Sequence, residues 1–77
     1  MKKKKKYLCI CYFNVWSEPV ESVFDIEANN EVEARMQSIK KIKELKKVDD
    51  LFETNEIQQI ELYEVNPVGN IDVNLFQ

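Results

Sequence analysis

Histidine is absent from this 77-residue sequence, and glycine occurs only once. Without histidine the commonest general base of enzymes is missing, and no Ser-His or Cys-His catalytic pair can form. The single glycine, Gly69, excludes a glycine-rich loop of the kind that binds phosphate groups. The chain is therefore expected to be a binding protein with no catalytic residue, and not an enzyme.

Cysteine is also scarce, with Cys9 and Cys11 the only two. Tetrahedral zinc needs four ligands, and no other cysteine or histidine is present to complete such a set. On a β-strand, residues two apart point to the same side with Cα atoms about 7 Å apart, a poor geometry for a disulfide. We expect two reduced thiols that pack as small apolar residues, and neither a metal nor a cofactor.

No apolar run approaches the roughly 20 residues that span a bilayer. The lysine-rich start leads into Asn14 and Glu18 and lacks a small-residue cleavage site, which does not fit a secretory signal peptide. An apolar content of 44% with a charged content of 32% is typical of one small globular domain. The sequence thus predicts a cytoplasmic protein without a membrane partner.

Charge is distributed unevenly along the chain. The net charge is −3 although Lys2 to Lys6 are all basic, so the remainder is more acidic than the total indicates. From Val48 onward there is no Lys or Arg. We expect residues 1–6 to form a flexible basic arm and residues 7–77 to form a single α+β domain. Direct nucleic-acid binding by the arm is the less favoured interpretation, because the acidic body repels phosphates at short range.

Hydrophobic periodicity predicts four strands and one helix. Asn30 is placed to cap the helix, with Glu33 three residues later as in a capping box. Pro67 and Gly69 supply turn chemistry before the last strand. The order ββαββ predicts a four-stranded antiparallel sheet, ordered second, first, third and fourth strand, with the helix packed on one face. The expected strands are residues 7–16, 20–27, 56–65 and 71–76, and the helix ends near Lys47.

One helix covers only one face of such a sheet. The helix is expected to pack through an apolar stripe of Val32, Met36, Ile39, Ile42 and Leu45. The strand residues expected beneath it are Leu8, Ile10, Tyr12, Phe24, Ile26, Ile60, Leu62, Ile71, Val73 and Leu75. The opposite face then has an apolar, aromatic centre inside an acidic rim, which is typical of an interface. Its predicted partner-binding residues are Phe13, Val15, Glu21, Asp25, Glu27, Glu61, Tyr63, Val65 and Asp72.

The segment VFDIEANNEVEARMQSIKKI joins a strand ending in Ile-Glu-Ala to a capped, glutamate-rich helix. It resembles the strand–helix core of many short phage and mobile-element proteins, over about residues 20–45. The small size, acidic body and absent catalytic residues are also similar to the anti-CRISPR class of phage-encoded inhibitors. That class shares no fold or motif, so the resemblance implies no particular site residue. It implies an inhibitor that acts in the host cytoplasm.

These features together predict a small acidic inhibitor that binds a basic nucleic-acid-handling protein, such as a CRISPR effector or nuclease, and blocks its nucleic-acid binding as a DNA mimic. One alternative is a nucleic-acid-binding accessory protein that uses the lysine arm and the helix lysines between Lys40 and Lys47. Another is a homodimer in which two exposed sheet faces pack together and bury Phe13 and Tyr63. A face that long side chains or the N-terminal tail cover, without a partner, is the remaining interpretation.

Overall fold

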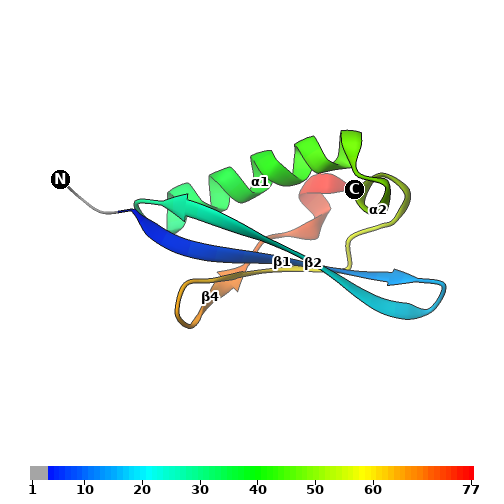
Figure 1. Cartoon of the computed structure of the whole chain (residues 1–77), viewed down its shortest axis with the longest axis horizontal. Coiled ribbons are helices and arrows are strands. Elements are labelled where there is room, and N and C mark those ends of the chain that lie inside the picture. The colour runs from blue at the N-terminus through cyan, green and yellow to red at the C-terminus, as the bar shows by residue number, and fades with distance from the viewer. Residues whose placement is uncertain (1–3) are drawn as a thin grey trace.

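The computed structural model describes residues 4–77, which form a twisted sheet with the helix α1 across one of its faces (Figure 1). The strands are antiparallel neighbours in the order β2-β1-β3-β4, so the predicted ββαββ architecture is confirmed. Two short helical segments add to it: α2 lies where a single turn was expected to bury Leu51 and Phe52, whereas η1 was not expected. The bounds are β1 Lys5–Val15, β2 Glu18–Ala28, α1 Glu31–Val48, α2 Asp50–Thr54, β3 Gln59–Tyr63, β4 Pro67–Asn70 and the 3-10 helix η1 Val73–Phe76.

Strands β1 and β2 form a long hairpin with a two-residue turn. Val15 pairs with Glu18, so Trp16 and Ser17 make the turn, and both have positive φ, 55° and 66°. Positive φ at both central residues is the geometry of a type I′ turn, whose twist matches that of the flanking strands. The expected turn at residues 17–19 is wrong, because the turn starts one residue earlier and both Glu18 and Pro19 belong to β2. As β2 is an edge strand, it tolerates a residue without an N–H.

Part of the lysine-rich segment belongs to the sheet. Lys5 and Lys6 are the first residues of β1 and pair with Ala28 and Glu27 of β2, so the expected flexible arm does not extend to residue 6. The hairpin reaches this far because β2 is as long as β1 and offers a partner for each residue. The Lys5 ammonium group also lies 4.0 Å from the Glu64 carboxylate. Of the predicted arm, Lys4 is exposed and precedes the strand, and residues 1–3 lie outside the described part of the chain.

The start of α1 confirms the predicted cap. The side chain of Asn30 accepts a hydrogen bond of 2.9 Å from the backbone N–H of Glu33, which satisfies one of the free donors of the first helical turn. The helix ends at Val48. Asp49 then caps the short helix α2 by accepting a hydrogen bond of 3.0 Å from the N–H of Leu51. The same chemistry therefore starts both helices.

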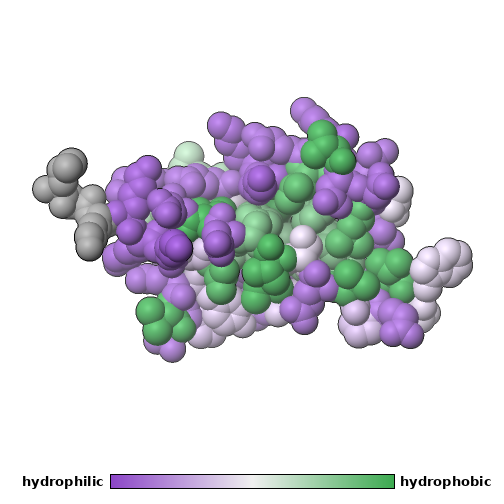
Figure 2. Space-filling model, in the orientation of Figure 1, coloured by the Kyte–Doolittle hydropathy of each residue, from purple (hydrophilic) through white to green (hydrophobic). Residues whose placement is uncertain are grey.

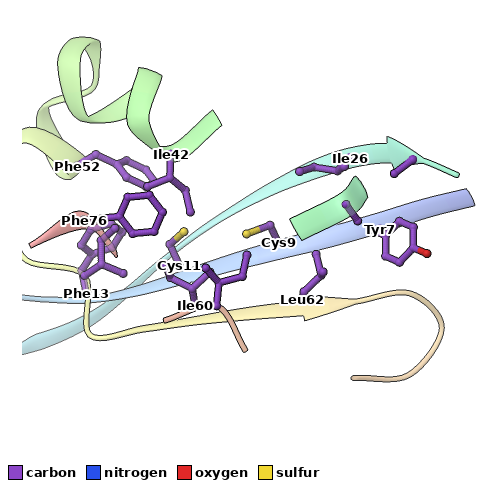
Figure 3. Packing of buried hydrophobic residues seen from close by; sticks show 14 residues of the cluster. Tyr7, Cys9, Cys11, Phe13, Ile26, Ile42, Phe52, Ile60, Leu62 and Phe76 are labelled. Carbon is purple, nitrogen blue, oxygen red and sulfur yellow. The ribbon is translucent and has the colours of Figure 1, made fainter. Parts of the chain in front are cut away.

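Strand β1 presents the opposite face to the helix from the one that the sequence predicts. The residues that it buries are Tyr7, Cys9, Cys11 and Phe13, which are at most 2% exposed (Figure 3). The residues expected there lie on the other face, and they are Leu8, Ile10 and Tyr12. Nearly every position of β1 is apolar, so an alternation of period two does not distinguish its faces. Which face of β1 is buried therefore depends on how well its side-chain volumes fit against the helix.

The predicted stripe is confirmed for Ile42, which is buried, and for Ile39 and Leu45, which are half-buried against the core. The other two buried residues of the helix are small, and they are Ala34 and Ser38. Val32 and Met36, predicted to be buried, are 67% and 66% exposed. Ser38 contacts the Cys9 thiol of β1, and its hydroxyl donates to the Ala34 carbonyl at 2.8 Å, so no buried polar group is left unpaired there. Small residues on both elements let the helix lie close to the sheet at the centre of the core.

Larger side chains fill the end of the core under α2. The rings of Phe13 and Phe52 meet edge to face, with centroids 5.0 Å apart and an interplanar angle of 81° (Figure 3). Ile42 of α1 lies next to this pair in the same view. Phe13 is therefore a core residue, and the prediction that it lies on a partner-binding face is wrong.

The segment after β3 differs from the expected fourth strand at residues 71–76. Strand β4 comes earlier, at Pro67–Asn70, in the segment predicted as a turn, and η1 occupies most of the predicted strand. The Asp72 carboxylate accepts a hydrogen bond of 2.9 Å from the N–H of Asn74 and caps η1. This local side-chain bond competes with strand pairing and ends the extended conformation.

An arginine of α1 holds β4 in place. The Arg35 guanidinium donates to the backbone carbonyls of Asn70 at 2.6 Å and Val68 at 3.3 Å, and it also pairs with Glu31 at 3.0 Å. Between those carbonyls lies Gly69, with a φ of 142°. The backbone conformation favours glycine, and a Cβ atom at this position would displace the guanidinium group from its place between the two carbonyls.

Candidate protein-binding face

The face of the sheet that points away from α1 is called here the open face. Among residues 4–77, every helical segment lies on the other side of the sheet (Figure 1). The alternation of the strands assigns to the open face Lys6, Leu8, Ile10 and Tyr12 of β1, Glu21, Val23, Asp25 and Glu27 of β2, and Gln59, Glu61 and Tyr63 of β3.

The centre of the open face is apolar and aromatic. Ile10 lies directly between Val23 of β2 and Glu61 of β3, and Leu8 lies between Asp25 and Tyr63. Leu8 is 40% exposed and Val23 is 52% exposed. Neighbours across strands interact on one face of a sheet. The apolar centre is therefore a continuous patch, and it consists of Leu8, Ile10, Tyr12, Val23 and Tyr63.

A hydrogen-bonded cluster fixes the two tyrosines of this patch. The Tyr12 hydroxyl donates to one Glu61 carboxylate oxygen at 2.5 Å, and the Tyr63 hydroxyl donates to the other at 3.2 Å. The hydrogen bond to Glu61 raises the pKa of Tyr12 to about 12, because ionisation would place a second negative charge beside the carboxylate. Burial and the same carboxylate raise the pKa of Tyr63. Both rings are thus held in one orientation before any partner arrives.

An acidic rim borders the apolar centre. Glu21, Asp25 and Glu27 recur along β2 on the open face, and all three are exposed. With Glu61 they make four carboxylates, against one lysine, Lys6, which pairs across the strands with Glu27. None of the three carboxylates of β2 accepts a side-chain hydrogen bond from a residue between 4 and 77. Asp25 and Glu27 also line a hollow at the edge of the sheet with Lys40 and Lys41 of α1. On the open face itself the carboxylates outnumber the lysine, and this net negative charge attracts a basic surface.

The structure brings together five of the nine predicted partner-binding residues, and they are Glu21, Asp25, Glu27, Glu61 and Tyr63. The other four lie elsewhere. Phe13 is in the core, and Val15 is half-buried on the same side of β1. Val65 is 89% exposed in the connection between β3 and β4, and Asp72 caps η1. Phe13 and Val15 were misplaced by the choice of face for β1, and Asp72 by the expected fourth strand.

Three residues of the face were missed for the same reason, and they are Leu8, Ile10 and Tyr12. The sequence carried only a partial signal for the choice of face. Both sides of β1 have a tyrosine, Tyr7 on the buried side and Tyr12 on the open face, so a tyrosine does not distinguish them. The two cysteines lie on one side only, and their thiols tolerate burial without a hydrogen-bond partner.

Within residues 4–77, neither a metal-binding cluster nor a membrane-spanning helix accompanies the open face. In residues 4–77 there is no group of three or more His, Cys, Asp or Glu side chains placed to hold a metal ion. Cys9 and Cys11 are free and fully buried, and the pKa of Cys11 is raised by its contact with the Cys9 thiol and by burial. No helix in the described part of the chain has the length and apolar character to cross a membrane.

Comparison of the chain with protein-family models, with curated proteins and with solved structures gives no match. The open face therefore has to be interpreted from its own geometry.

Proposed function

We propose that this chain is an inhibitory binding protein that uses its open face to occupy the nucleic-acid-binding surface of a basic protein. The observation that carries the proposal is the combination of an apolar centre, held rigid by the Tyr12–Glu61–Tyr63 cluster, with an acidic rim. Apolar, aromatic patches with polar rims are the common composition of protein interfaces.

The negative charge of the acidic rim favours a basic protein as the partner. Proteins that bind nucleic acid present basic grooves to the phosphates. Along β2, Asp25 lies about 13 Å from Glu21 and about 7 Å from Glu27, at the rise of about 3.3 Å per residue that strands have. Such a line of negative charge suits a groove that is built for a line of phosphates. It speeds the encounter with a basic partner, and the apolar centre then slows dissociation.

The partner class follows the resemblance to small phage inhibitors. A CRISPR effector, or another nuclease directed against phage, has the basic surface that the open face complements. In this proposal the protein competes with the nucleic acid of that enzyme and needs no catalytic group of its own.

The test uses a panel of purified guide-loaded CRISPR effectors and labelled target DNA. The protein is expected to prevent DNA binding by at least one effector. Reversal of the rim with Glu21→Lys, Asp25→Lys and Glu27→Lys should then weaken effector binding by about tenfold or more, or about 1.4 kcal/mol, and reduce its salt dependence. Reversal of Glu44, Glu53 and Glu56 to lysine makes the same change in net charge at exposed sites off the open face, and should change affinity little.

Two results would contradict the proposal. In one, the rim variant and the control variant lose affinity equally, so that net charge alone matters. In the other, no effector is inhibited and the wild-type protein binds the labelled DNA itself. The second result would favour an accessory protein that binds nucleic acid through exposed lysines in the second half of α1, where the surface is mostly hydrophilic (Figure 2), and these are Lys40, Lys41, Lys43 and Lys47.

A further inference from the structure

The tip of the β1–β2 hairpin carries an unusual residue. Trp16 is the only tryptophan of the chain, and it is 95% exposed although tryptophan is highly buried on average. Strand β3 pairs with β1 only as far as Tyr12, so the tip extends beyond the three-stranded part of the sheet (Figure 1). A large aromatic side chain is thus held out in solvent at the end of a ribbon.

The backbone of this tip is strained. Type I′ turns favour asparagine and glycine because both central residues need positive φ, and here Trp16 and Ser17 occupy those positions. A bulky residue with positive φ is a genuine outlier. Trp16 packs on none of the core of its own molecule, so folding gains nothing from it. The hairpin needs this turn but not a tryptophan in it, and backbone strain at such a residue is characteristic of binding sites, which points to a contact outside the molecule.

A complementary hollow of about 380 Å³ lies where the last turns of α1 meet η1. Its apolar part comes from Leu75, which is 54% exposed, and Phe76. Lys43, Lys46, Lys47 and Gln77 line the rest. A floor of apolar side chains with ammonium groups around it suits an indole ring, because lysine ammonium groups are attracted to the face of tryptophan.

The charges of tip and hollow are opposite. No Lys or Arg occurs between residues 7 and 34, and the part of β2 next to the hairpin turn carries Glu18 and Glu21. The open faces, in contrast, carry like charges, so two of them would repel if they were packed together. Among the surfaces of this chain, the acidic hairpin tip and the basic hollow are therefore the better matched pair.

We propose that two copies of the chain associate by reciprocal docking, with Trp16 of each copy in the hollow of the other. The hairpin turn and the last turns of α1 lie toward the same end of the long axis (Figure 1), so both contacts can form at once around a two-fold axis. Such an arrangement is closed and does not grow into a filament. Glu18 then lies near the lysines of the partner hollow. This inference is independent of the proposed function, and it leaves both open faces free.

The expected dimer is weak. A tryptophan buries roughly 150–250 Å². Two such contacts, with the matching area of the two hollows, bury about 600–1,000 Å², which is below the lower end of stable interfaces at about 1,200 Å². Association in the micromolar range, reduced by salt, is the corresponding expectation. Two open faces on one dimer would also bind a repetitive or dimeric partner more tightly than either face alone.

The single tryptophan makes the test direct. Sedimentation equilibrium of the full chain should show the mass rising from one chain to two with concentration, and the Trp16 fluorescence should shift to the blue with the same midpoint. In Trp16→Asn/Ser17→Gly the turn receives its preferred residues, so the hairpin folds, and the dissociation constant should rise at least about tenfold. Val65→Ala removes another exposed apolar side chain and should leave the dimer unchanged.

Exchanging the charges of Glu18 and Lys46 tests whether the hairpin tip docks in this hollow. Glu18→Lys alone and Lys46→Glu alone should each weaken the dimer, and the two together should restore it, because each contact then regains opposite charges. A wild-type protein that stays one chain at several hundred micromolar, with the emission of exposed tryptophan, would overturn the inference. So would a dimer that Trp16→Asn/Ser17→Gly leaves intact, or single charge variants without effect.

Discussion

Glu61 is the residue on which the geometry of the open face depends. Its carboxylate accepts both tyrosine hydroxyls, one from the neighbouring strand β1 and one from its own strand β3. Charge-assisted hydrogen bonds of this kind are shorter than neutral ones and orient the groups that form them. The cluster therefore couples the aromatic surface of the sheet to the ionisation of its tyrosines.

Alkaline pH should loosen this cluster. Folding raises the pKa of Tyr12 to about 12 from the ordinary value of 10.0, so the stabilisation is fully present below pH 10 and is lost as the pH rises toward 12. Urea unfolding of the wild type is expected to show a fall in the free energy of unfolding between pH 9 and 12. The fall over the same pH range should be smaller in Tyr12→Phe. Phenolate absorbance should show a tyrosine that ionises near pH 12 in the wild type, and this ionisation should be missing in Tyr12→Phe. An unchanged titration in Tyr12→Phe would contradict the assignment.

At the scale of elements, the distance between α1 and the sheet is set by small residues. Ala34 and Ser38 of the helix are fully buried, as are Cys9 and Cys11 of β1. Larger residues lie toward the ends of the core, where Phe13 meets Phe52 under α2. The pairing of small with small at the centre explains why the helix does not use its larger residues Val32 and Met36 for packing.

Enlarging the centre should therefore be destabilising. Ala34→Leu inserts a branched side chain where the helix lies close to the sheet, and overpacking of this kind costs about 1–3 kcal/mol in the free energy of unfolding. Met36→Leu, on the exposed side of the same helix, should change it by less than about 0.5 kcal/mol. Urea denaturation of the two variants and the wild type measures both. Equal stabilities of Ala34→Leu and the wild type would show that the helix is free to move away.

At the scale of the whole molecule, both the charged side chains and the strand pairing are distributed unevenly. Carboxylates dominate the open face, and lysines dominate the second half of α1 on the opposite layer. The molecule is elongated, with extents of 46 × 24 × 18 Å, because the β1–β2 hairpin is longer than the rest of the sheet. Strand β1 has a partner on both sides only from Leu8 to Tyr12.

Hydrogen exchange should follow this unequal pairing. Amides of β1 between Leu8 and Tyr12 are expected to exchange only through unfolding of the whole domain, whereas amides next to Trp16 exchange through local fraying. Measurement of native-state exchange in increasing urea separates the two, because only global opening depends strongly on urea. Equal protection along the whole hairpin would contradict this expectation for the monomer. Slower exchange at the tip at high protein concentration would instead indicate the proposed dimer.

Local chemistry in the sequence was sufficient for the order of the first three strands and the main helix. The Asn30 cap predicted the start of α1, and alternation in β2 predicted that Glu21, Asp25 and Glu27 share a face. These signals act within a few residues, through a side chain bonding its own backbone or through the period-two geometry of a strand. A four-stranded antiparallel sheet with one covering helix followed from connection rules alone.

Only the tertiary structure decided which side of β1 is buried and which stripe of α1 covers it. More than one packing is possible for a strand that is apolar at nearly every position and for a helix with several apolar stripes. The alternation of apolar and polar residues does not show how well the side-chain volumes fit together. The choice is made through space, by the close fit of Ala34 and Ser38 over the cysteines. The same holds for β4, which Arg35 of α1 stabilises, because a guanidinium 33 residues away in the chain is invisible to local patterns.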